Sequence, residues 1–131
     1  MREKDIQSLF TKWVRQNYKE SAAWELKVCK QGRALAYTAF QPQQIPSLLK
    51  AKHECIYKKL SDMDPSLKPF DALQICRSKA YVVVVWYKPY CLKEAVWLDI
   101  DAFVHEQETS QRKSLTQERA RQIAEKVTIL D

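Results

Sequence analysis

The chain has 131 residues, and its 22 Lys and Arg against 16 Asp and Glu give a formal net charge of +6. A hydrophobic share of 46% and a charged share of 29% exclude a disordered chain, and the length predicts one domain over residues 1–131. No apolar run approaches the ~18 residues that cross a bilayer, and the first residues lack the apolar core of a signal peptide. We therefore expect a cytoplasmic protein with reduced thiols and no membrane partner, and the basic excess allows a polyanionic partner.

The first half of the chain predicts a helix, two strands and a second helix. Apolar side chains three and four residues apart predict a helix over 3–18. Alternation predicts a strand over 22–29, followed by a turn at 30–33 and a return strand over 34–40. After a proline, the apolar spacing predicts a helix from 43 to about 60.

The middle of the chain predicts two more strands after a polar, proline-containing loop over 61–69. These strands cover 70–76 and 80–87 and are joined by a short turn. The second strand has the sequence AYVVVVWY, which is apolar throughout. Such a run is typical of a strand that is covered on both faces, so we expect it at the centre of the sheet.

The last part of the chain predicts a strand over 95–100, then a short helix and a polar loop over 101–113. The residues from Ser114 to Gln117 resemble a capping box, which predicts a final helix that ends near Val127. The expected order is therefore α-β-β-α-β-β-β-α. This order predicts a mixed β-sheet flanked by helices, an α/β fold.

The single glycine, Gly32, excludes the two glycine-rich nucleotide-binding motifs, the dinucleotide fingerprint and the P-loop. The four cysteines form no Cys-x-x-Cys pair, and the two histidines do not have the spacing of zinc ligands. We expect the cysteines to be small buried side chains rather than metal ligands.

The sharpest local feature is the tripeptide Glu25-Leu26-Lys27 on the predicted strand. Residues i and i+2 of a strand share a face, so the carboxylate and the ammonium project together from a rigid element. A carboxylate binds a hard cation through oxygen, and a lysine beside it orients a water or stabilises phosphate charge. The alternative is an ordinary solvated strand face.

The order of the motifs resembles the PD-(D/E)xK nuclease superfamily, in particular archaeal-type Holliday junction resolvases and their small phage relatives. The shared features are an acidic residue on the first helix (Glu3), the ExK motif at 25–27, a helix that opens with Gln-x-x-x-Leu (Gln44 to Leu48), and a hydrophobic strand. They span residues 1–87. The resemblance implies a restriction-endonuclease-like fold and a Mg²⁺ cofactor, for which Mn²⁺ can substitute.

The resemblance also implies roles for individual residues. Glu25 would bind the metal, and Lys27 would assist the attack on the phosphate. Gln44 would contact the lysine or a phosphate, or it is only a first-turn helix residue. Glu3 would be a third or a water-bridged metal ligand, or it is an exposed acid favoured by the helix dipole.

One departure from the family pattern concerns the aspartate that normally precedes the ExK motif. The residues between the first helix and Glu25 contain no aspartate. We expect Asp71, which follows a proline at the start of a predicted strand, to meet Glu25 as its replacement. Asp62 and Asp64 are rivals in the same region, and Asp71 itself has the alternative role of a turn-capping residue.

These features predict a metal-dependent, structure-selective DNA endonuclease similar to a Holliday junction resolvase, with roles in DNA recombination and repair. We expect a homodimer on branched DNA, because resolving a junction needs two coordinated cuts. The apolar strand over 80–87 and the aromatic residues Trp86, Tyr87 and Trp97 belong either to the dimer interface or to the core. The alternatives to a nuclease are a non-catalytic nucleic-acid-binding module and a protein-interaction domain with an accidental ExK.

Overall fold

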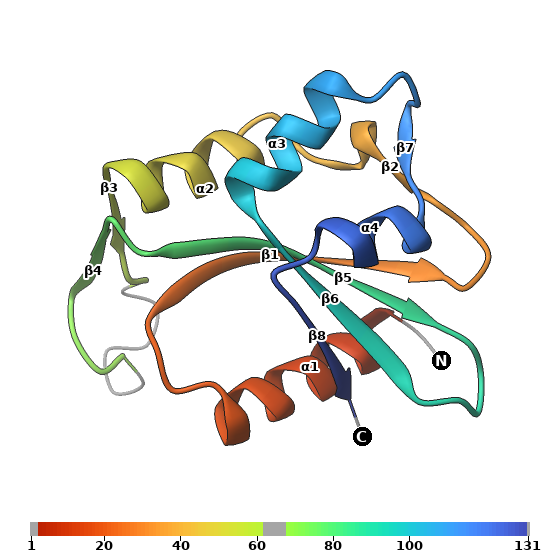
Figure 1. Cartoon of the computed structure of the whole chain (residues 1–131). Helices are drawn as coiled ribbons and strands as arrows, with labels where there is room; N and C mark the ends of the chain where they lie inside the picture. The colour runs from red at the N-terminus through yellow and green to blue at the C-terminus, as the bar shows by residue number, and fades with distance from the viewer. Residues whose placement is uncertain (1–2, 62–67, 131) are drawn as a thin grey trace.

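The computed structural model describes residues 3–61 and 68–130, and it has the expected mixed α/β architecture. Its main sheet has four strands in the order β1-β5-β6-β8 (Figure 1). β1 (Ala22–Lys30) runs parallel to β5 (Lys79–Tyr87), while β6 (Lys93–Asp99) and β8 (Lys126–Leu130) extend the sheet in antiparallel steps. The strand that carries the ExK motif, β1, is thus an edge strand of this sheet.

One face of the sheet is covered by α1 (Glu3–Asn17). Ile6, Phe10 and Val14 are buried there against Tyr81 and Trp97, as the helical spacing of the apolar residues predicts. Burying one large apolar side chain stabilises the fold by roughly 1.5–3 kcal/mol, so this stripe fixes the helix on the sheet.

The other face carries three helices: α2 (Gln44–His53), α3 (Ile100–Thr109) and α4 (Gln117–Ile123). Their apolar side chains pack on Val82 and Val84 of β5, which is buried on both faces. The prediction of a central strand over 80–87 is therefore confirmed. Because Trp86 and Trp97 are also buried within this one chain, neither is available for a dimer interface.

The predicted return strand over 34–40 is mostly wrong. Only β2 (Leu35–Ala36) is extended, and it pairs with β7 (Ser114–Leu115) instead of with β1. A 3₁₀ turn (η1, Tyr37–Ala39) follows, because the Tyr37 and Phe40 rings pack on Phe103 of α3. Residues 37–40 therefore lie against α3 and do not join the main sheet.

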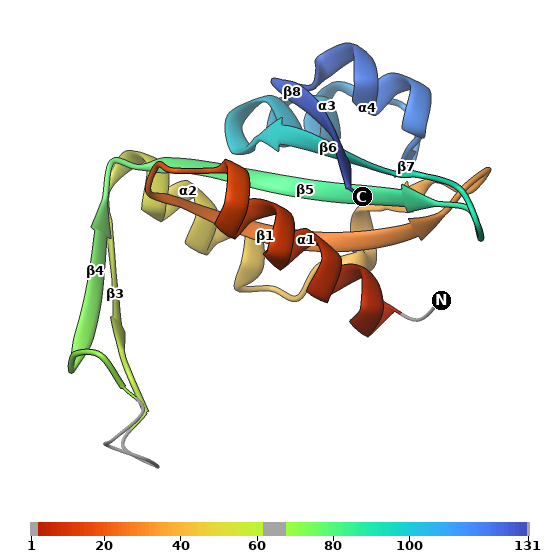
Figure 2. The ribbon, with the colours of Figure 1, turned by 90° about the horizontal axis from the view of Figure 1, so that it is seen from below.

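The predicted helix over 43–60 is too long, since α2 ends at His53. The residues beyond it form β3 (Cys55–Lys59), which pairs with β4 (Ala72–Cys76) in a separate two-stranded sheet. We call residues 55–76 the arm, of which 55–61 and 68–76 are described. Figure 2 shows the described part of the arm projecting from one end of the main sheet.

A disulfide joins Cys55 to Cys76 at the base of the arm, where their Cα atoms are 4.0 Å apart. The expectation of four reduced, buried cysteines is therefore wrong for this pair, which antiparallel pairing places directly opposite each other. Cys29 is buried as expected, whereas the thiol of Cys91 is exposed.

The C-terminal part differs from the prediction in the position of the last helix. Ser114 lies in a strand, and Thr116 is the actual N-cap, since its hydroxyl accepts a hydrogen bond from the Arg119 N–H. The helix stops at Ile123 and β8 follows, so a helix to Val127 is wrong. The alternating burial along β8 shows the two-residue period of a strand.

Candidate functional site

Three polar side chains from β1 and α2 meet above the edge of the sheet: Glu25, Lys27 and Gln44. Along β1, Trp24 and Leu26 pack in the core under α1, so the intervening Glu25 and Lys27 point to the opposite face. The Gln44 Nε2 donates to Glu25 Oε1 at 2.9 Å, and the Lys27 Nζ donates to Gln44 Oε1 at 3.2 Å. The amide of Gln44 therefore links the carboxylate to the ammonium.

The backbone before α2 fixes this arrangement. The Gln41 N–H donates to Gln44 Oε1 at 3.0 Å, which sets the orientation of the Gln44 amide. The Lys27 Nζ also donates to the Ala39 carbonyl at 3.0 Å and lies 4.8 Å from the centre of the Phe40 ring. The unexpected 3₁₀ turn thus supplies one wall of the site.

The site remains open to solvent at both charged groups. The side chains of Lys27 and Glu25 are 18% and 30% exposed, and their charged atoms are 3.7 Å apart. Glu25 Oε2 accepts no hydrogen bond from any described residue. The ammonium has three N–H groups and uses two of them on Ala39 and Gln44, so the third is left for a ligand.

The donor set fits only one kind of metal site. Within residues 3–61 and 68–130, no three His, Cys, Asp or Glu side chains are grouped so that they could hold a metal ion. Mg²⁺ keeps several waters and is often held by one or two carboxylates together with substrate phosphates. Glu25 with its open Oε2 fits that arrangement, whereas a cage built entirely from protein ligands does not fit.

The structure does not bring Glu3 to this site. Glu3 begins α1, which covers the face of the sheet opposite to the Glu25 side chain. Its carboxylate is exposed and accepts a hydrogen bond from Gln7 at 3.4 Å. The reading of Glu3 as an exposed acid at a helix start fits this placement, because a negative charge there is favoured by the helix dipole.

The structure does not bring Asp71 to Glu25 either, because the expected pairing of their strands is wrong. β4 pairs with β3 and β1 pairs with β5. Asp71 precedes β4 at the outer end of the arm, a strand length of ~17 Å from the disulfide. Its side chain is 91% exposed and forms an ion pair with Lys68 at 3.3 Å. Asp62 and Asp64 lie outside the described residues.

A second polar network joins the end of α2 to the start of α3 and was not predicted from the sequence. Lys52 Nζ lies 2.7 Å from Asp99 Oδ1 and 2.6 Å from Asp101 Oδ2, and His53 Nε2 lies 2.8 Å from Asp101 Oδ1. Burial lowers the pKa of Lys52, but hydrogen bonds to the two aspartates outweigh it and raise that pKa. Hydrogen bonds from Lys52 and then His53 lower the pKa of Asp101.

One residue of this network could have been predicted from the sequence: Asp99, which comes directly before α3. Its carboxylate accepts hydrogen bonds from the backbone N–H groups of Asp101 and Ala102, which makes it an N-cap. Asp99 is thus occupied by Lys52 and by the start of the helix, and Asp101 is occupied by Lys52 and His53. The network braces two helices and leaves no open carboxylate pair for a ligand.

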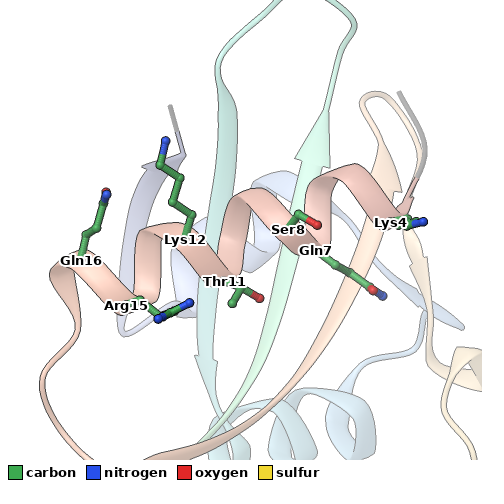
Figure 3. A pocket seen from close by; sticks show the side chains of 7 residues that line it. All are labelled: Lys4, Gln7, Ser8, Thr11, Lys12, Arg15 and Gln16. Carbon is green, nitrogen blue, oxygen red and sulfur yellow. The ribbon is translucent and has the colours of Figure 1, made fainter.

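A hollow of about 720 Å³ lies along the outer side of α1 and away from Glu25. Figure 3 shows Ser8 and Thr11 between Lys4 at one end and Lys12 and Arg15 at the other. Every side chain that lines it belongs to one helix, so it is a furrow in the surface of α1 and not an enclosed cavity. Its three cations and lack of carboxylates make it a polyanion-compatible surface.

Comparisons of the chain with protein-family models, with curated proteins and with solved structures found no match. Among the described residues, no helix has both the length and the apolar character that crossing a membrane requires. The function is therefore inferred from the residues of the site itself.

Proposed function

We propose that this protein is a metal-dependent DNA endonuclease with a structure-selective, Holliday junction resolvase-like activity. The observation that carries the proposal is the Gln44 amide, which holds the Glu25 carboxylate and the Lys27 ammonium in one constellation. All three residue types occur in the order that the PD-(D/E)xK resemblance implies. The parallel pairing of β1 and β5 across α2 also fits a nuclease-like core.

Each residue of the site has a distinct task in this proposal. A divalent cation, Mg²⁺ or Mn²⁺, held by Glu25, water and a DNA phosphate would supply Lewis-acid stabilisation and a more acidic water. Lys27 donates its third N–H to an oxygen of the scissile phosphate and offsets the charge that develops there. Gln44 positions both side chains, because its oxygen accepts from Lys27 while its nitrogen donates to Glu25.

A second candidate function is a non-catalytic DNA-binding module on the same fold. The observation that favours it is the small donor set, since the described residues include no group of three His, Cys, Asp or Glu side chains that could hold a metal ion. Binding by such a module would need the basic surface but no metal. The two candidates therefore differ in one respect: the nuclease cuts DNA when a divalent cation is added, whereas the binding module does not.

The test is a cleavage assay of the whole chain on four-way junction and linear duplex DNA in Mg²⁺, Mn²⁺ and Ca²⁺. We expect cutting in Mg²⁺ and Mn²⁺, and a loss of at least ~100-fold in Glu25→Gln, which removes the charge but keeps the shape. Binding in Ca²⁺ should change little, because phosphate contacts supply most of the affinity. Glu108→Gln, an exposed change on α3, is the matched control.

Two outcomes decide between the candidates. Undiminished cutting by Glu25→Gln contradicts the assignment of the site. Tight binding with no cutting in either metal, by the wild type, favours the non-catalytic module.

We further propose that the protein works as a homodimer on branched DNA. The support is the outer edge of β1, which pairs with no described strand and is nine residues long. A free edge of this length is a template for strand addition by a second copy. Light scattering at micromolar concentration should give twice the mass of 15.4 kDa, and an excess of linear duplex should not inhibit junction cleavage. A monomer that cuts junction and linear duplex equally contradicts the homodimer proposal and leaves the nuclease proposal standing.

A further inference from the structure

Two turns lie side by side at the carboxyl ends of β1 and β5, over residues 30–33 and 88–93. The Gln31 N–H donates to the Tyr87 carbonyl at 2.7 Å, and the Trp86 indole N–H donates to the Arg33 carbonyl at 2.8 Å. Trp86 is buried and belongs to the central strand. The turns are therefore held to the rigid part of the sheet, and we call them together the basic end.

The charge of the basic end is entirely positive. Its two segments have the sequences KQGR and KPYCLK, with four cations and no carboxylate. Lys93 is buried, and its Nζ donates to the Cys91 carbonyl at 2.7 Å. Lys30, Arg33 and Lys88 are exposed, and none of them forms an ion pair with a described residue. Three unpaired cations on a fixed backbone attract phosphate.

The basic end also contains a hollow of about 390 Å³. Lys30 and Lys88 supply its charges, Tyr87 and Pro89 its apolar walls, and Gln31 and Gly32 its remaining lining. A volume of this size lies within the range of small-ligand sites, ~300–1,000 Å³. A flat apolar wall beside two cations matches the two parts of a nucleotide, the base and the phosphate.

Tyr90 follows the hollow directly and has an unusual conformation. Its φ of 64° is in the left-handed region, which costs an L-residue roughly 1–2 kcal/mol. Its side chain is fully exposed, so no packing within the described chain compensates for that cost. The aromatic ring is thus presented to solvent next to Pro89 and Lys88.

We propose that the basic end binds an unpaired nucleotide of the DNA strand that passes the Glu25–Lys27–Gln44 site. Lys30, Lys88 and Arg33 contact its phosphates, and the base stacks on the aromatic surface of Tyr87 and Tyr90. Only an unpaired base exposes a face to such a platform, because duplex bases are stacked on their neighbours. Lys30 is three residues beyond Lys27, or ~10 Å along β1, and this odd spacing turns the two side chains to opposite faces of the strand, so the DNA strand would pass around the end of β1 to reach both places. This inference rests on the proposed DNA substrate.

The experiment measures binding by fluorescence anisotropy in Ca²⁺, so that cleavage does not interfere. The probes are a blunt 20-bp duplex and the same duplex with a five-nucleotide single-stranded overhang, with and without bases on the overhang. The variants are Lys30→Gln with Lys88→Gln, and Tyr90→Ala. The matched controls lie on the arm, where Lys58→Gln and Tyr57→Ala remove an exposed cation and an exposed aromatic ring.

We expect Tyr90→Ala to weaken binding of the overhang probe about tenfold and to leave the blunt and base-free probes unchanged. The double lysine variant should weaken binding of both overhang probes, with and without bases, about tenfold and reduce the slope of log K against log salt concentration by ~1.4–1.8. The arm variants should change affinity less than twofold. Unchanged circular dichroism spectra will show that the exposed substitutions leave the fold intact.

Three results would overturn the inference: no effect of the lysine pair, an equal effect of the arm variants, or an equal effect of Tyr90→Ala on all probes. The outcome is separable from that of the proposed nuclease. If the chain binds overhangs through the basic end but never cuts, the inference stands and the nuclease proposal fails. If it cuts normally with the basic end altered, the nuclease stands and this inference fails.

Discussion

The two ends of β1 differ in charge, in chemistry and in how they are held. The arm, at the amino end, has three lysines and three aspartates over residues 55–76 and so no net charge. It exposes Tyr57, Phe70 and Leu73. The basic end, ~27 Å along the strand, has only cations. The net charge of +6 therefore does not come from the most prominent projection of the molecule, so the arm and the basic end should respond differently to a polyanion.

The two ends also differ in their attachment. The basic end is hydrogen-bonded to the central strand. The arm is a separate two-stranded sheet with a disulfide at its base. A two-stranded hairpin alone is marginally stable in water, so the disulfide supplies much of the order of the arm. Four measurements test this contrast.

The largest expected effect is that of reducing the Cys55–Cys76 disulfide. It closes a loop with a sequence separation of 21 residues, for which the chain-entropy model gives about 3 kcal/mol. Hydrogen exchange of the β3 and β4 amides should therefore accelerate ~100-fold in a reductant or in Cys76→Ser. The amides of β5 and of the basic end should not change. Equal acceleration throughout the chain would contradict the view of the arm as an independent unit.

The next effect concerns the salt dependence of DNA binding. Each phosphate contact contributes a slope of ~0.7–0.9 in a plot of log K against log salt concentration. Lys88→Gln should reduce the slope by that amount, whereas Lys58→Gln on the arm should leave it unchanged. Titrations between 50 and 200 mM salt measure both. A reduced slope for Lys58→Gln would mean that DNA contacts the arm as well as the basic end, which would contradict the proposed difference between them.

A smaller effect concerns the ion pair that braces α2, the helix between the arm and the site. Lys52 and His53 lower the pKa of Asp101. The ion pairs of Asp101 therefore stabilise the folded state fully above pH ~4, the pKa in the unfolded chain, and this contribution is lost as the pH falls through the lowered pKa of the folded state. Because Asp101 is 43% exposed, the contribution is modest, ~0.5–1 kcal/mol. Urea unfolding should show Asp101→Asn less stable than wild type by this amount at pH 7 and equal to it well below pH 3. A difference that persists in acid would exclude the ion pair as its cause.

The smallest effect compares the left-handed residues at the two ends of β5, Arg77 at the arm and Tyr90 at the basic end. Their φ angles are 47° and 64°. Glycine relieves the strain but makes the unfolded chain more flexible, so each change to glycine should stabilise the fold by only ~0.5 kcal/mol. Thermal unfolding measures this. Tyr90→Gly should also lose overhang binding, whereas Arg77→Gly should keep it, and equal losses would remove the special role of Tyr90.

Local periodicity predicted the elements with a strong pattern. The stripe of α1, the strand that carries Glu25 and Lys27, and the buried central strand all follow from the spacing of apolar residues. The motif order also led to Gln44, which proves to contact both residues of the ExK motif. The resemblance, and not the spacing, pointed to Gln44, because the return strand predicted between β1 and α2 was mostly wrong.

Long-range pairing could not be predicted in the same way. Asp71 was expected beside Glu25 because its strand was assumed to join the main sheet, but Ile56 and Ile75 pair with each other across the arm instead. The first of these residues continues the apolar spacing of the preceding helix, so periodicity alone does not reveal the break at Glu54. Such pairing depends on the partner strand and not on the local pattern.

The short distance between Cys55 and Cys76 has a consequence for how the chain could have acquired its projection. Consecutive Cα atoms are ~3.8 Å apart, and these two are 4.0 Å apart. A gene in which codon 55 were followed directly by codon 76 would encode a chain that closes without moving either α2 or β5. The arm thus has the geometry of an insertion that can be gained or lost in a single genetic step, leaving the sheet, the Glu25 site and the basic end as one uninterrupted unit.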